Sequence, residues 1–166
     1  MPEPVTVDLK EATLKFIDGN TTTPEELVLK LDDGNLTYTR RRNMEYRKDR
    51  GILDTVREGD QEPMDVSLEC RFAALKSQSG NNITITEFLE REGAGSSLYT
   101  TGGACEPYAI DIHVELDRDC GTTQDEIMKF EEFRFEEIGG DFKAGTLSIS
   151  GKCNRLKPTS ELTTLS

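Results

Sequence analysis

Apolar and polar residues alternate along most of this chain, and a period of two predicts β-strands rather than helices. The alternation is clearest in residues 64–72 (MDVSLECRF) and 108–117 (YAIDIHVELD). In the first segment Val66, Leu68 and Cys70 share one face, and in the second Ile110 and Ile112 do. We therefore expect these strands to bury one face and to expose the other to solvent.

Two further features of the pattern predict local structure. Residues 27–38 read LVLKLDDGNLTY, with alternating residues on both sides of Asp33-Gly34, which is typical of a β-hairpin. Residues 126–138 read EIMKFEEFRFEEI, and the apolar parity slips at Glu131-Glu132. A β-bulge at these two glutamates would explain the slip.

One segment breaks the strand pattern and predicts a helix over residues 85–92. Thr84 and Glu87 form a capping-box signal, Phe88 and Leu89 supply an apolar stripe, and Gly93 marks the end. The fold class expected from the whole pattern is mainly β, a two-layer antiparallel β-domain with one short flanking α-helix. We expect one domain over residues 1–157 and a flexible C-terminal tail over 158–166.

A long loop covers residues 40–63, and we call it the arm. It has no clear period, although loops of this length are uncommon in compact domains unless they are functional or disordered. Residues 40–57 carry seven basic and three acidic side chains, so this part is +4 in a chain of net charge −12. The rest of the chain is therefore −16.

The arm has three interpretations, namely a nucleic-acid contact, a solvated loop, or a contact with another copy of the chain. The acidic host disfavours general nucleic-acid binding, which needs a basic footprint. Apolar residues within the arm disfavour a plain solvated loop. A basic arm on an acidic body favours head-to-tail contact between copies. The predicted subunit-interface residues are Arg40, Arg41, Arg42, Met44, Tyr46, Arg47, Lys48, Arg50, Ile52, Leu53, Val56 and Arg57.

The residues needed for common enzyme chemistry do not form recognisable motifs. The single histidine, His113, lies in mid-strand on the polar parity and is expected to be an exposed strand residue. The chain has no Cys-x-x-Cys pair, no nucleophile elbow and no phosphate-binding glycine loop. We therefore predict no catalytic residue, no metal site and no cofactor. The four cysteines are expected to be thiols, with a Cys105–Cys120 disulfide the less favoured alternative.

No apolar run reaches the length of about 20 residues that spans a membrane. The first ten residues also lack the basic start and apolar core of a secretory signal. We therefore expect a chain that folds in a cytoplasm and does not insert into membranes.

Four stretches of the sequence resemble the tail tube (major tail) proteins of long-tailed bacteriophages. They are LVLKLDDGNLTYTRRR, RGILDTVREGDQEPMDVSLECRF, CEPYAIDIHVELDRDC and KAGTLSISGKCN. The similarity covers residues 14–154, and LDTVREGDQEPMDV is its most distinctive part. None of these stretches is a chemical signature, so the resemblance concerns architecture.

The resemblance implies an antiparallel β-sandwich or half-barrel with one short flanking α-helix and a long interface loop. It also implies a structural subunit that assembles into hexameric rings, and rings that stack into a tube for DNA. Its implied partners are other copies of the chain and other tail proteins, such as tape measure, terminator and distal tail proteins. Genomic DNA would pass through the lumen without specific binding, and the tube would belong to a virion tail assembled in the host cytoplasm. Acidic residues would line the lumen, where like charge keeps DNA from adhering. The candidates are Asp65, Glu69, Asp111, Glu115 and Asp117.

Two other functions remain open from the sequence. The inner-tube protein of a contractile injection or secretion machine would share this architecture. A small β-barrel carrier would instead be a monomer with an apolar ligand pocket inside its own barrel.

Overall fold

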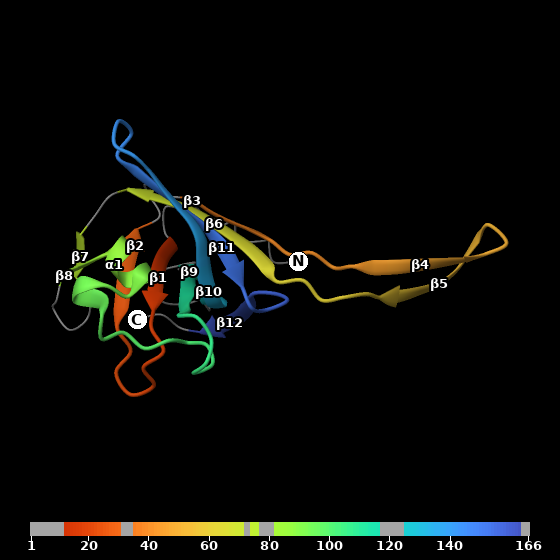
Figure 1. Ribbon diagram of the computed structural model, residues 1–166, viewed down its shortest axis with the longest axis horizontal. Coiled ribbons are helices and arrows are strands. Elements are labelled where there is room, and N and C mark those ends of the chain that lie inside the picture. The colour runs from red at the N-terminus through yellow and green to blue at the C-terminus, as the bar shows by residue number, and fades with distance from the viewer. Residues whose placement is uncertain (1–11, 31–34, 72–73, 77–81, 117–124, 164–166) are drawn as a thin grey trace, which may run out of the picture.

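The computed structural model describes residues 12–30, 35–71, 74–76, 82–116 and 125–163, and Figure 1 shows their arrangement. Strands dominate, and there is one short α-helix, α1 (Ile85–Glu90). The mainly β fold class expected from the sequence is thus confirmed. The strands are β1 (Ala12–Ile17), β2 (Glu26–Lys30), β3 (Asn35–Thr39), β4 (Met44–Asp49), β5 (Ile52–Glu58), β6 (Met64–Arg71), β7 (Ala74–Lys76), β8 (Asn82–Thr84), β9 (Ile110–Leu116), β10 (Asp125–Asp141), β11 (Thr146–Cys153) and β12 (Thr159–Thr163).

The main sheet has eight strands in the order β2-β1-β9-β10-β11-β6-β3, and β12 pairs with the first part of β10. Every pairing in this sheet is antiparallel. Two small sheets, β4–β5 and β7–β8, stand apart from it.

The main sheet curls, because its two edge strands are neighbours in sequence. Seven flat strands would hold β2 and β3 about 29 Å apart, whereas the five residue steps from Lys30 to Asn35 span at most about 18 Å. The rings of Tyr38 on β3 and Phe130 on β10 lie 5.3 Å apart between centroids, although β11 and β6 separate their strands in the sheet. The sheet is therefore a half-barrel, and the predicted hairpin over residues 27–38 is wrong because β2 and β3 do not pair.

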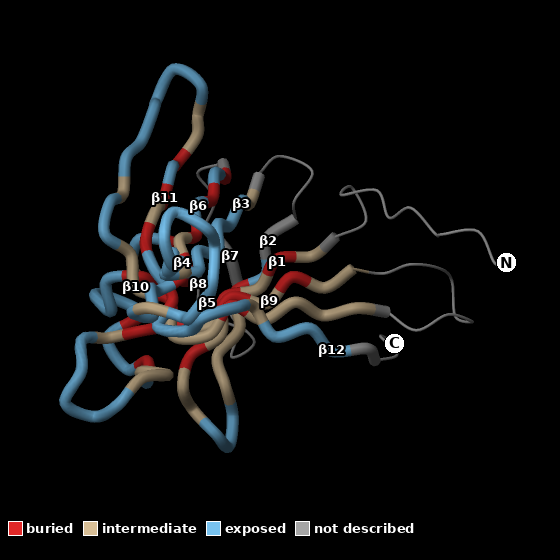
Figure 2. The backbone as a smooth tube through the Cα atoms, turned by 90° about the vertical axis from the view of Figure 1, so that its right-hand side faces the viewer, coloured by how far each residue is buried: buried red, intermediate tan, exposed pale blue. Residues whose placement is uncertain are grey.

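The core fills the inside of this curl. Alternate residues of β9 and β11 are buried, as the sequence pattern predicts. Helix α1 covers the core, and the ring of Phe88 lies 6.0 Å from that of Phe16 on β1. Figure 2 shows the buried residues concentrated in the middle of the molecule, with the hairpins and loops exposed. The largest fully buried side chains are Phe16, Phe88, Phe130, Phe133, Leu14, Leu27, Met64, Leu98, Ile110, Ile112, Ile149 and Val66.

The β-bulge predicted at Glu131-Glu132 is confirmed. The register between β10 and β9 shifts between Phe130 and Phe133, and Glu132 has a φ of 55°. Both phenylalanines are buried despite their opposite parity in the sequence. The carboxylate of Asp111 accepts the backbone N–H of Glu132 at 3.0 Å, which anchors the bulge.

Helix α1 begins as the sequence predicts and ends earlier. The hydroxyl of Thr84 accepts the backbone N–H of Glu87 at 3.2 Å, so the predicted N-terminal cap is present. Arg91 adopts a left-handed conformation with a φ of 57°, and the helix therefore ends at Glu90 rather than at residue 92.

Two segments that were expected to be irregular form strands instead. The arm is a β-hairpin, β4–β5, that projects away from the body of the molecule (Figure 1). In the predicted C-terminal tail, Thr159–Thr163 form β12, which pairs with the segment of β10 from Asp125 to Lys129. Backbone hydrogen bonding to β10 orders this part of the tail, so it belongs to the sheet.

Candidate assembly surfaces

A two-residue turn closes the hairpin arm. Arg50 and Gly51 have φ values of 50° and 83°, and they connect Asp49 directly to its partner Ile52. Positive φ at both turn residues is the geometry that matches the twist of a two-stranded ribbon. The arm is therefore a regular β-ribbon and not an irregular loop.

A β-bulge in the arm brings its apolar residues onto one side. The pairing shifts from Arg47↔Thr55 to Lys48↔Leu53, which leaves Asp54 without a paired residue. Because side chains alternate along each strand, this shift returns Leu53 to the side that carries Tyr46 and Val56. Without the extra residue, Leu53 would point the other way. The apolar face of the arm consists of Met44, Tyr46, Leu53 and Val56.

This apolar face is exposed along most of its length. The exposed fractions are 63% for Tyr46, 68% for Leu53 and 53% for Val56. Lys48 lies on the same side, and Glu58 does so near the base. The opposite side is mostly polar and holds Glu45, Arg47, Asp49, Ile52, Thr55 and Arg57. An amphipathic ribbon with an uncovered apolar side is the feature that typically marks a contact with another molecule.

Several arm cations already have partners within the chain. A guanidinium nitrogen of Arg41 lies 2.7 Å from a carboxylate oxygen of Asp65 on β6 and links the base of the arm to the body. Arg57 pairs with Glu45 across the ribbon. The other pair, Arg42 with Glu58, is at 4.0 Å. Within the described parts of the chain no ion pair holds Arg40, Arg47, Lys48 or Arg50.

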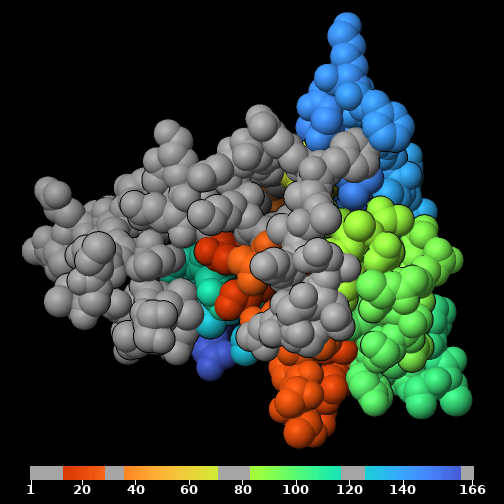
Figure 3. Space-filling view, turned by 90° about the vertical axis from the view of Figure 1, so that its left-hand side faces the viewer, coloured from red at the N-terminus to blue at the C-terminus, as the bar shows by residue number. Residues whose placement is uncertain are grey.

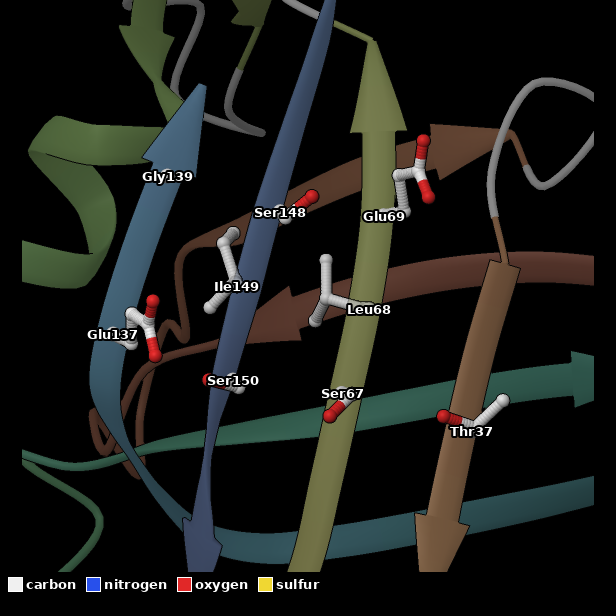
Figure 4. Close-up of a pocket in the computed structure, with 9 residues that line it drawn as sticks. All are labelled: Thr37, Ser67, Leu68, Glu69, Glu137, Gly139, Ser148, Ile149 and Ser150. Atoms are coloured by element: carbon white, nitrogen blue, oxygen red, sulfur yellow. The ribbon is translucent and has the colours of Figure 1, made fainter. Parts of the chain in front are cut away.

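The second candidate surface is the outer side of the main sheet over β3, β6, β11 and β10. The register places Thr37, Ser67, Ser150 and Glu137 in one row across these four strands. The next row contains Asn35, Glu69, Ser148 and Gly139. A hollow of about 310 Å³ lies along these rows (Figure 4), and hydroxyl and carboxylate side chains line it.

Glu69 is the predicted lumen residue that contributes to this hollow. Its carboxylate is exposed, and no ion pair holds it among the residues described here. Glu137, which the sequence analysis did not select, lines the same hollow from β10. The row of hydroxyl residues was also missed, because finding it requires the strand order as well as the polar parity of each strand.

Three of the other predicted lumen residues have partners within the chain. Asp65 lies between Arg41 and Lys152, whose Nζ is 3.9 Å from a carboxylate oxygen. The carboxylate of Glu115 lies 3.0 Å from the ammonium of Lys15. Asp111 accepts the bulge N–H described above. Asp117 lies outside the described residues.

The pKa values of Asp111 on β9 and Lys15 on β1 are both raised. Desolvation raises the pKa of Asp111, although hydrogen bonds from Glu132 and Thr101 oppose this rise. Burial lowers the pKa of Lys15, but the hydrogen bond and charge of Glu115, with help from Glu26, raise it overall. This part of the outer sheet surface is therefore a region of mixed, internally paired charge.

The cysteines of the described segments do not form disulfides. Cys70 and Cys153 are buried, and burial raises the pKa of these thiols to about 11 and about 12. Cys105 is an exposed free thiol, and Cys120 lies outside the described residues. Neither thiol of the buried pair is a reactive thiolate at neutral pH.

The described residues contain no group of three or more His, Cys, Asp or Glu side chains arranged to hold a metal ion. None of their helices has the length and hydropathy needed to cross a bilayer.

Comparison of the chain with family models, with curated proteins and with solved structures gives no significant match. The functional argument therefore rests on the two surfaces described above.

Proposed function

We propose that this chain is a structural subunit that assembles with copies of itself into a tube, in the manner of phage tail tube proteins. The observation that carries the proposal is the arm, a projecting β-hairpin whose apolar face has no cover within the described chain. A two-stranded ribbon alone is at best marginally stable in water. Burial of its apolar face against a neighbouring subunit would stabilise both the ribbon and the assembly.

The charge distribution supports an assembly of copies with a defined direction. The arm is basic and the remainder of the chain is strongly acidic, so the two attract each other between molecules. A contact between two different surfaces of identical subunits closes into a ring or continues as an open filament. A tube of stacked hexameric rings combines both outcomes, because each ring is closed and the stack of rings continues as a filament.

The outer sheet surface over β3, β6, β11 and β10 is the proposed lumen surface. Its exposed carboxylates, Glu69 and Glu137, repel nucleic-acid phosphate, and its serine and threonine side chains are small. DNA would pass such a wall without strong adhesion. On this proposal Asp111 and Glu115 serve the structure of the sheet, because their carboxylates are engaged within the chain.

The test of assembly is negative-stain electron microscopy of the purified chain, with sedimentation velocity at increasing concentration. We expect rings or tubes with an axial channel. The variant Leu53→Glu, on the apolar face of the arm, should lose them. The matched control, Thr55→Glu, lies two residues away on the opposite face and should retain them. A wild-type chain that stays monomeric at every concentration would contradict the proposal.

The lumen surface is tested with the double variant Glu69→Lys/Glu137→Lys. This variant should still form tubes, and those tubes should retain duplex DNA that wild-type tubes release, as measured by co-sedimentation at low salt. Tubes of the variant that bind no more DNA than wild-type tubes would place the lumen on another surface.

The two alternative functions predict different outcomes. A ligand carrier would remain a monomer and would bind an apolar molecule inside its sheet, but that space is filled by core side chains. An inner tube of a contractile injection machine would also assemble into rings. It differs from a phage tail tube in its cargo, so the DNA retention assay also tests this alternative.

A further inference from the structure

A hollow of about 420 Å³ lies beside α1. The segment that contains α1 is green in Figure 3. We call it the α1 hollow. Its apolar lining comes from Leu89 on α1, Pro107 and Tyr108 in the loop before β9, and Phe135 on β10. Tyr108 and Phe135 also pack against the core from their other sides. The hollow thus has a fixed apolar floor, as binding sites for side chains commonly have.

The rim of the α1 hollow carries negative charge. Glu90 and Glu92 line it, both are exposed, and neither belongs to an ion pair among the described residues. Arg134, which also lines the hollow, and the neighbouring Arg91 are both engaged. Arg134 binds Glu106 at 2.8 Å and the carbonyl of Pro107 at 2.9 Å, whereas the guanidinium of Arg91 lies over the Tyr108 ring, 5.6 Å from its centroid. The two free carboxylates therefore remain available to a cationic partner.

We infer that the α1 hollow of one copy receives the apolar face of the arm of another copy. This inference rests on the proposed function and names the acceptor that the proposal requires. The apolar face supplies Tyr46 and Leu53 for the floor, while Lys48 on that face and Arg50 in the turn supply cations for Glu90 and Glu92. Each chemical feature of the arm has its complement at this hollow.

The other hollows fit the arm less well. Six of the nine residues that line the outer sheet hollow are Ser, Thr or Glu, so burying Leu53 there would desolvate polar groups without compensation. The hollow at the base of the arm is lined by Gln61, Glu62 and Pro63 and belongs to the arm's own root. In Figure 1 the arm projects to the side opposite α1, so a copy does not fill its own α1 hollow. The contact is therefore between molecules and runs from head to tail.

The test uses full-length variants that each lack one side of the contact. Glu90→Lys/Glu92→Lys reverses the charge at the rim of the α1 hollow. Leu53→Glu places a charge on the apolar face of the arm. We expect each variant alone to associate at least about tenfold more weakly than wild type in sedimentation velocity. An equimolar mixture should form a one-to-one dimer and stop, because only one functional arm and one functional hollow remain. The control, Glu69→Lys/Glu137→Lys, has the same change in charge and should assemble normally.

A charge exchange separates a lost contact from a damaged fold. Adding Lys48→Glu/Arg50→Glu to the hollow variant should restore assembly, which a misfolded protein would not do, and the thermal melting of all variants should match wild type. Normal tubes from Glu90→Lys/Glu92→Lys, or no restoration on charge exchange, would overturn this acceptor site and leave the proposed function intact. Failure of the wild-type chain to assemble would overturn both.

Discussion

The sheet of the body and the hairpin of the arm are both antiparallel, yet they differ in what covers their apolar faces. In β9 and β11 alternate side chains are buried inside the curled sheet. In β4 and β5 all residues except Met44 are exposed, although the ribbon has an apolar face of its own. The same strand pattern thus produces a closed core in one region and an uncovered surface in the other.

The difference separates the residues that stabilise the folded monomer from those that would stabilise an assembly. The body buries its core within one chain, so the stability that this core provides belongs to the monomer. The arm leaves Tyr46, Leu53 and Val56 in water, and their burial would contribute only when another surface covers them. Changes in the body should therefore alter unfolding, and changes in the arm should alter association.

The largest expected effect comes from removing a core ring. Phe130→Ala deletes a buried side chain that contacts Tyr38 across the curl, and it should lower the free energy of unfolding by about 3–5 kcal/mol. Tyr46→Ala on the arm should change it by no more than about 0.5 kcal/mol. Chemical denaturation of the two dilute monomeric variants measures both values. Equal losses would remove the distinction between body and arm.

A smaller effect is expected from two glycines of the sheet. A methyl group at Gly151 would lie 2.1 Å from the carbonyl oxygen of Arg134, where β10 and β11 change register, so the backbone must move. Gly151→Ala should cost about 1–3 kcal/mol. Gly139→Ala meets nothing within 4 Å and is the matched control, with little expected loss. Thermal melting of both variants tests whether the body is closely packed where β10 and β11 change register.

The body was largely predictable from the sequence because each strand has its own periodicity. The parity of 64–72 and 108–117 identified the buried faces, and the slip at Glu131-Glu132 identified the bulge. Strand order was not predictable in the same way. Asp33-Gly34 carries a strong hairpin signal, yet the strand order places β2 and β3 at opposite edges of the curled sheet. Long-range pairing determined that outcome, and a local turn signal does not report it.

The arm shows why part of the candidate site was missed. Its bulge removes the regular alternation that identifies a ribbon, and its turn is Arg50-Gly51 rather than the usual Asn-Gly or Asp-Gly. The segment therefore read as a loop, although its interface residues were selected from charge and apolar content. The α1 hollow was not predictable, because α1, β10 and the loop before β9 come together only in the fold.

The smallest expected effect concerns His113, the single histidine of the chain and a residue of the body. The sequence suggested an exposed residue, but His113 is half-buried on β9 between Lys15 and Lys129. Burial and the charges of these lysines lower its pKa, against the opposing charges of Glu115 and Glu131. Protonation is therefore easier in the unfolded chain than in the folded one.

A lowered histidine pKa stabilises the fold above the unfolded value of about 6.5, and this contribution is lost as the pH falls through the folded value. Between pH 7 and pH 5.5 the free energy of unfolding of wild type should fall by about 1 kcal/mol or less. The free energy of unfolding of His113→Gln should change less over the same pH range. The raised pKa of Asp111 acts in the opposite direction at acid pH, so the difference between the two proteins is the informative quantity. Parallel curves would show that His113 does not contribute. Because the arm has no histidine, a real difference would assign this pH response to the body sheet.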